Sequence, residues 1–167
     1  MAALVRHSVT PGDRGTAPAS WTGGDLARPT LIVAAHPRCP CTRATLHELE
    51  SILQAAGPRV SCVVLFTVPA AAGDGWMRSD VWKQAALPVK VRADIDGREA
   101  GSLGARTSGH TFLFAADGRL LFSGGITASR GHVGPSTGRG AVLAQLDREG
   151  AAMETPVFGC PLTPMWR

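Results

Sequence analysis

The stretch from Thr30 to Leu53, TLIVAAHPRCPCTRATLHELESIL, decides how this chain folds. Its short apolar run predicts a strand at 30–35, and the amphipathic pattern that follows predicts a helix at 41–56. The apolar face of that helix carries Leu46, Leu49, Ile52, Leu53 and Ala56. Two cysteines, Cys39 and Cys41, therefore lie where the strand gives way to the helix.

Two thiols at the start of a helix are typical of a redox site. Backbone N–H groups at a helix N-terminus favour the thiolate, which is the reactive form of cysteine, and the charge of Arg38 acts in the same direction. We interpret Cys39 as the exposed nucleophile and Cys41, in the first helical turn, as the resolving thiol; the reverse assignment stays open. Two unrelated cysteines or a structural metal knuckle are the competing interpretations, but a zinc knuckle needs a second cysteine pair and the sequence has none.

Composition and charge set the broad class of protein. The 167 residues are 44% hydrophobic and 18% charged, as in one ordinary globular domain. The net charge of +4 comes from scattered arginines without a Lys/Arg block, so we expect no nucleic-acid partner. No apolar run approaches the roughly 20 residues of a membrane span, so the chain alone has the character of a soluble protein without a membrane anchor. We expect it to be a monomer.

The rest of the pattern predicts an α/β protein. A β-branched run at 59–68 predicts a central strand with Cys62 in the core. The other expected elements are a helix near 79–87 that buries Val81 and Trp82, a strand at 89–93, a turn at 94–97, strands at 111–115 and 119–123 around Ala116-Asp117-Gly118, a glycine-rich loop at 124–140 and a helix at 138–148. This order favours a central mixed β-sheet flanked by helices, and a cysteine pair after the first strand makes it the order of the thioredoxin-like fold.

Both ends of the chain are expected to be irregular. The predicted division is a flexible N-terminal arm at 1–28 with Trp21 as its anchor, a thioredoxin-like domain at 29–150, and a C-terminal tail at 151–167 packed on the domain. Each large apolar side chain of Pro156–Leu162 gains ~1.5–3 kcal/mol by full burial, so this segment should fold back. Cys160 is then either an inert buried thiol or a third sulfur that exchanges with the first two.

Two loops are expected beside the cysteine pair. In this topology the first strand of the hairpin begins next to the cysteines and the second returns to the same edge, so the loop Thr107-Ser108-Gly109-His110 and the loop after Ser123 should border the site. The candidate supporting residues are His36, Arg38, Thr42, Gly109, His110, Arg130 and His132. Each of the three histidines is either a base or ligand near the sulfurs or an ordinary polar residue.

Three motifs carry a resemblance to a known family. HPRCPCTRATLHEL at 36–49, TSGHTFLFAADGRLLFSGGITASRGHVG at 107–134 and PVFGCPL at 156–162 resemble the thioredoxin-like RedB family of bacterial proteins, over most of the chain. The resemblance implies a thioredoxin fold, a redox role, and a place in the bacterial periplasm or on a membrane anchor outside the cytoplasm. Two positions depart from the pattern. Gly109 stands where thioredoxins have a cis-proline that shapes the peptide groove and keeps metals off the sulfurs, and Gly134–Thr137 stands where an acidic or amide residue is expected.

The sequence therefore predicts a thiol–disulfide oxidoreductase. A thiolate attacks a partner disulfide, and the second cysteine resolves the mixed disulfide. The expected partners are protein thiols or disulfides, or a reductase donor, and no organic cofactor is implied. One alternative is a Sco-like Cu(I)-binding module that uses Cys39, Cys41 and His110 or His36. A second alternative is a peroxiredoxin-like peroxidase, in which one cysteine becomes a sulfenic acid and Arg130 polarises the peroxide.

Overall fold

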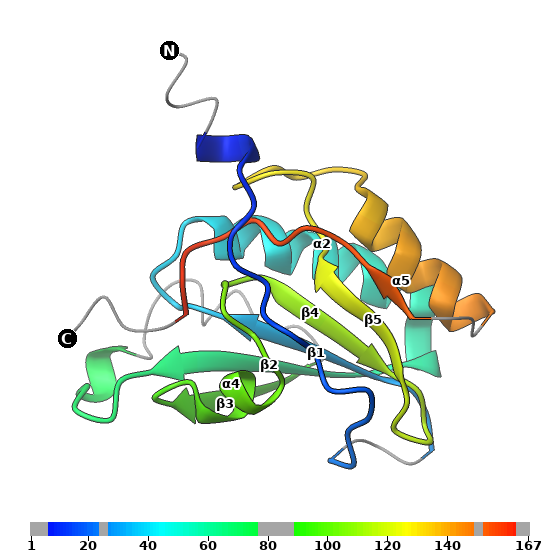
Figure 1. Cartoon of the computed structure of the whole chain (residues 1–167), viewed down its shortest axis with the longest axis horizontal. Helices are drawn as coiled ribbons and strands as arrows, with labels where there is room; N and C mark the ends of the chain where they lie inside the picture. Colours follow the sequence, from blue (N-terminus) through cyan, green and yellow to red (C-terminus); the bar gives the residue numbers. More distant parts are fainter. Residues whose placement is uncertain (1–6, 24–26, 77–88, 149–151, 163–167) are drawn as a thin grey trace.

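The protein is built around one six-stranded mixed sheet (Figure 1). This computed structural model describes residues 7–23, 27–76, 89–148 and 152–162. The spatial order of the strands is β3-β2-β1-β4-β5-β6. In chain order they are β1 (Thr30–Ala35), β2 (Ser61–Val68), β3 (Lys90–Ile95), β4 (His110–Phe114), β5 (Leu120–Gly125) and β6 (Met153–Glu154). The predicted central mixed sheet is confirmed.

Helices cover both faces of the sheet (Figure 1). Their bounds are α2 (Cys41–Ala56), α4 (Arg98–Ser102) and α5 (Thr137–Asp147), with 3₁₀ turns η1 (Gly57–Arg59) and η2 (Asp74–Trp76). Apolar residues of α2 and α5 pack with Leu113 and Phe122 in one core cluster. Ala100 of α4 and Leu103 just after it pack with Ile32 and Phe112 in a second cluster on the opposite face.

The central strand β1 runs parallel to β2 and antiparallel to β4. All six of its residues are buried, because helices lie on both faces, and this burial explains the continuous apolar run. The predicted bounds of β1 and α2 are confirmed residue for residue. β2 begins two residues later than predicted, because Pro58 is part of the turn η1. Cys62 lies in the core, as predicted, and burial raises the pKa of its thiol to about 12.

The predicted turn at 94–97 is confirmed at Asp96-Gly97, because β3 runs on to Ile95, and a short helix that was not predicted, α4, follows the turn. Asp94 is buried, and its carboxylate accepts hydrogen bonds from the N–H groups of Glu99 (2.8 Å) and Ala100 (2.9 Å) at the start of α4. Gly97 precedes the helix with a φ of 67°, a conformation that favours glycine. The expected helix near 79–87, with Val81 and Trp82, lies outside the described residues.

The hairpin of β4 and β5 is confirmed around the predicted turn 116–118. β5 continues to Gly125, two residues beyond its predicted end. α5 begins after Ser136, whose hydroxyl accepts a hydrogen bond from the N–H of Arg139 (3.1 Å). This cap fixes the end of the loop between β5 and α5.

Segments from the two ends of the chain lie side by side on the sheet (Figure 1). The N–H of Gly12 donates to the carbonyl of Val157 (2.8 Å), and β6 pairs in parallel with β5. The Trp21 ring packs against Phe114 with centroids 5.5 Å apart, which fits its expected role as an anchor. The division into arm, domain and tail stays a prediction. None of the helices in the described residues has the length and apolar character needed to cross a membrane.

Candidate functional site

Cys39 lies in the turn between β1 and α2. Its N–H donates to the carbonyl of His36 (3.1 Å), and its carbonyl accepts from the N–H of Thr42 (3.0 Å). Its Sγ lies 3.0 Å from the Sγ of Cys160. Cys39 is only 2% exposed, whereas Cys41 is partly exposed. The structure thus differs from the expectation of an exposed nucleophile, because Cys160 lies against the Cys39 sulfur.

The environment separates the three thiols by acidity. Burial raises the pKa of Cys39, but hydrogen bonds from Cys160 and Cys41 outweigh it, and the net result is a lowered pKa. Burial and the neighbouring Cys39 sulfur raise the pKa of Cys41. Burial and the same Cys39 sulfur raise the pKa of Cys160 to about 12. Cys39 is therefore the thiol that ionises first, with the other two as hydrogen-bond donors to it.

Arg130 is the cation beside the sulfurs. Its positive charge lowers the pKa of both Cys41 and Cys160, against the larger effect of burial. Its guanidinium also donates to the carbonyls of Gly159, His7 (3.0 Å) and Thr10 (3.4 Å). The loop after β5 thus borders the cysteines, as the topology predicts, and it also holds segments from both ends of the chain.

Two of the predicted basic residues, Arg38 and His132, make contacts with groups other than the sulfurs. The guanidinium of Arg38 lies over the Trp76 ring, 3.8 Å from its centroid, an arrangement that a cation–π attraction stabilises. The charge of Arg130 lowers the pKa of the Cys41 and Cys160 thiols, and the effect of Arg38 on the sulfurs stays a prediction. His132 is exposed, and its N–H donates to the carbonyl of Ser129 (3.3 Å).

His36 and Thr42 join the start of α2 to the loop before β4. The Thr42 hydroxyl donates to the His36 carbonyl (2.9 Å) and shares a hydrogen bond with the Ser108 hydroxyl (3.1 Å). The Ser108 oxygen also accepts from the N–H of His36 (2.9 Å). Burial and the charge of Arg38 lower the pKa of His36, so its imidazole is neutral near pH 7. Ser108 was not singled out from the sequence, although its loop was.

The loop before β4 presents its backbone to the C-terminal segment, which we define as residues 155–162. The N–H of Ser108 donates to the carbonyl of Cys160 (2.8 Å), and Thr107 forms an antiparallel bridge with Pro161. Gly109 has a φ of 91°, and a Cβ there would lie 3.0 Å from the Thr45 hydroxyl, so only glycine suits this position.

His110 belongs to the sheet interior rather than to the cysteines. It is fully buried, its Nε2 lies 2.9 Å from the Ser123 hydroxyl, and its ring stacks on Phe112 with centroids 4.1 Å apart. Burial and the charge of Arg14 lower its pKa to about 3. No three His, Cys, Asp or Glu side chains are placed to hold a metal ion in the part of the chain that the structure describes. The structure therefore does not assemble Cys39, Cys41 and His110 as a ligand set.

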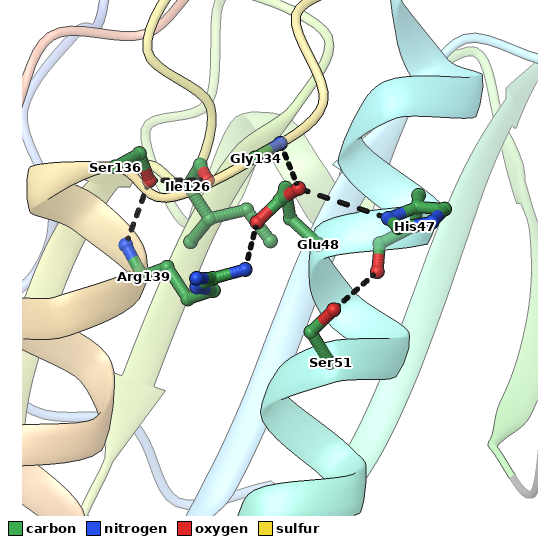
Figure 2. Close-up of polar contacts among 7 residues, drawn as sticks. All are labelled: His47, Glu48, Ser51, Ile126, Gly134, Ser136 and Arg139. Atoms are coloured by element: carbon green, nitrogen blue, oxygen red, sulfur yellow. Dashed lines mark hydrogen bonds and ion pairs between the residues drawn. The ribbon is translucent and has the colours of Figure 1, made fainter.

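A buried carboxylate fixes the loop that carries Arg130 (Figure 2). Glu48 of α2 is 0% exposed; its carboxylate accepts from Nη1 of Arg139 (2.9 Å) and from the N–H of Gly134 (2.7 Å). His47 lies farther away, with Nδ1 3.7 Å from the carboxylate. Glu48 was not predicted as a site residue from the sequence. The available signal was its position on the buried face of α2, four residues before Ile52.

Comparisons with known proteins bear on the fold. No protein-family model and no curated protein matches the sequence. An uncharacterised conserved protein from Geobacillus kaustophilus superposes with a TM-score of 0.67 at 17% identity, covering 95% of this chain and 94% of that chain. A hypothetical protein from Sinorhizobium meliloti gives 0.65 at 18% identity, covering 96% and 99%.

A third similar structure is a secreted Mycobacterium tuberculosis disulfide oxidoreductase described as homologous to Escherichia coli DsbE. It superposes with a TM-score of 0.51 at 18% identity, covering 77% of this chain and 96% of that chain. Identities this low establish the architecture and leave the chemistry to the residues of the site. The chain has a thioredoxin-like α/β fold, with Cys39 in the turn after β1 and Cys41 as the first residue of α2.

Proposed function

We propose that the protein is a thiol–disulfide oxidoreductase whose nucleophile is Cys39. The observation that carries this proposal is the lowered pKa of Cys39, in a turn before α2 where two further thiols are its hydrogen-bond neighbours. A thiolate is the species that attacks disulfides, and a nearby second thiol is needed to release the product. The similarity to a disulfide oxidoreductase fold supports the same proposal.

The reaction proceeds by two exchanges. The Cys39 thiolate attacks one sulfur of a partner disulfide, so that a Cys39–partner bond forms and the other partner sulfur leaves as a thiolate. Cys41 then loses its proton and attacks Cys39, so that a Cys39–Cys41 bond forms and the second partner sulfur leaves. The partner gains two electrons and two protons, and the cysteine pair loses them. Run in reverse, the same steps oxidise a partner dithiol.

We also propose that the partners are proteins outside the cytoplasm. Disulfides persist in oxidising compartments, and a secreted protein is among those with a similar fold. The resemblance of the motifs at 36–49, 107–134 and 156–162 to the RedB family is consistent with that location.

The test is the reduction of insulin disulfides by dithiothreitol in the presence of the purified protein. We expect the wild type to accelerate the reaction and Cys39→Ser to abolish the acceleration, because no other thiol has a lowered pKa among the described residues. Cys62→Ala is the matched control; it removes a buried thiol outside the site and should keep the activity. A folded Cys39→Ser protein with wild-type activity would exclude the proposal.

A further inference from the structure

We propose that Cys160 is a third redox cysteine, which forms a disulfide with Cys39 and thereby fastens the C-terminal segment over the nucleophile. This inference rests on the proposed function for the chemistry of Cys39. It adds a site that the Cys-Pro-Cys motif does not contain, and it makes access to Cys39 depend on the redox state of the protein itself.

The two sulfurs are already placed for exchange. Their separation is 3.0 Å, and disulfide formation brings two sulfurs to about 2.05 Å, so a small side-chain rotation is sufficient. The two residues are 121 positions apart in the sequence, so the chain does not bring them together by local connection. Tertiary structure holds them there.

Backbone contacts on both sides of Cys160 determine its position. The Ser108 N–H donates to the Cys160 carbonyl (2.8 Å), and the N–H of Leu162 donates to the carbonyl of Arg106 (2.8 Å). Leu162 is 4% exposed and packs in the second core cluster. Gly159 fits only because it lacks a Cβ, since a Cβ there would lie 1.9 Å from the carbonyl oxygen of Ser108. The segment is therefore docked by backbone hydrogen bonds and one isolated antiparallel bridge, between Thr107 and Pro161, which place Cys160 against Cys39.

The exchange is balanced without a further oxidant. Once a partner disulfide has oxidised the pair, the Cys160 thiolate attacks Cys39, the Cys39–Cys41 bond breaks, and a Cys39–Cys160 bond forms. Cys41 leaves as a thiolate and takes up the proton that Cys160 has lost. Oxidation of the pair also favours the attack. It removes the Cys39 and Cys41 charges that raise the pKa of Cys160, while the charge of Arg130, which lowers it, remains.

The C-terminal segment also occupies the backbone edge beside the nucleophile. The Ser108 N–H is already bonded to Cys160, and Cys39 is buried. A disulfide from another protein can reach Cys39 only after the segment moves away. The Cys39–Cys160 bond prevents that movement, so the oxidised protein is closed and the reduced protein can open.

Peptide mapping tests the bond directly. The full chain is treated with oxidised glutathione, alkylated, and digested with trypsin without reductant. Peptide 39–43 carries Cys39 and Cys41, and peptide 149–167 carries Cys160. We expect the Cys41→Ser protein to yield the two peptides joined, with a mass lower by two hydrogen atoms than their sum. We expect Cys39→Ser to lose the joined species and Cys62→Ala to behave as the wild type.

A second experiment tests, in reduced protein, whether the C-terminal segment shields Cys39. In the reduced Cys41→Ser background, Gly159→Ala should displace the segment and increase the rate of Cys39 alkylation several-fold. Gly140→Ala is the matched control, because a Cβ at that exposed position of α5 meets no atom within 4 Å. Equal alkylation rates in the folded Cys41→Ser parent and its two glycine variants would contradict the inference that the C-terminal segment covers Cys39.

The outcomes separate this inference from the proposed function. Fully alkylated Cys39 and Cys160 in folded, oxidant-treated Cys41→Ser protein would overturn the inference, whether or not insulin is reduced. A joined peptide from a wild type that does not reduce insulin would leave the inference standing and exclude the proposed function. A joined peptide of equal yield in Cys39→Ser would show that Cys160 pairs with Cys41, and would also overturn the inference.

Discussion

His110 is a buried histidine held in its neutral form by the sheet. It begins β4 two residues before Phe112, so the two side chains share a face, and their rings are stacked. Burial and the charge of Arg14 lower its pKa from the ordinary 6.5 to about 3. The unfolded chain therefore binds a proton at this residue over a range of pH in which the folded protein does not.

This residue should make the fold sensitive to mild acid. Between about pH 6.5 and 3 the unfolded state binds more protons, so the free energy of unfolding rises with pH and falls on acidification, by about 1.4 kcal/mol per unit. We expect a loss of about 3 kcal/mol between pH 6.5 and 4 that His110→Gln lacks. Urea unfolding at both pH values measures it, with His132→Gln as the exposed control. An identical pH dependence in wild type and His110→Gln would contradict the prediction.

The contact between α2 and α5 depends on a buried ion pair (Figure 2). Glu48 is fully buried, whereas the side chain of Arg139 is 25% exposed. A carboxylate in this position needs its cation, because an unpaired buried charge is strongly destabilising. The pair also fixes the loop that carries Arg130, so stability and the arrangement of the site are linked at this contact.

We expect Arg139→Leu to lower the free energy of unfolding by about 3 kcal/mol, because it leaves the Glu48 carboxylate without its cation. The double variant Glu48→Leu/Arg139→Leu should lose less than that, because it removes both charges. Urea unfolding measures all of these variants. The control is Asp147→Asn, which breaks the exposed Arg59–Asp147 pair and should cost under about 1 kcal/mol. Additive losses in the double variant would show that the two residues are not coupled.

Segments from both ends of the chain close the molecule around the site. The carbonyls of His7, Thr10 and Gly159 all accept hydrogen bonds from Arg130, and Leu162 adds an apolar contact to the core. These contacts come from segments outside the strands and helices that the sequence pattern predicts.

We expect Leu162→Ala to lower the free energy of unfolding by about 2–3 kcal/mol, because it removes buried apolar volume from the second cluster. The control is Met153→Ala, at a 41% exposed position of β6, which should lower the free energy of unfolding by less than about 0.5 kcal/mol. Thermal unfolding followed by circular dichroism compares the two. Matching melting temperatures would mean that Leu162 contributes little to the core.

Local pattern predicted much of this molecule, and long-range contacts explain the remainder. β1 and α2 were predicted with their bounds because their apolar periodicity is uninterrupted. α4 was missed because it has five residues, two of them weak helix formers, and depends on the Asp94 carboxylate for its start. The cysteine pair was identified by its position, but the contact of Cys160 with Cys39 depends on backbone pairing that no local pattern encodes.

Cys160 is synthesised 35 positions after Gly125, the last residue of the β4–β5 hairpin. A ribosome adds about 5–20 residues per second, so roughly 2 to 7 seconds separate the emergence of the hairpin from that of Cys160. During that interval the nascent chain carries Cys39 beside a nearly complete sheet, with nothing from 155–162 to shield it. Newly made molecules should therefore be more prone than mature ones to exchange with small disulfides such as oxidised glutathione, forming a mixed disulfide at Cys39 and releasing one thiolate.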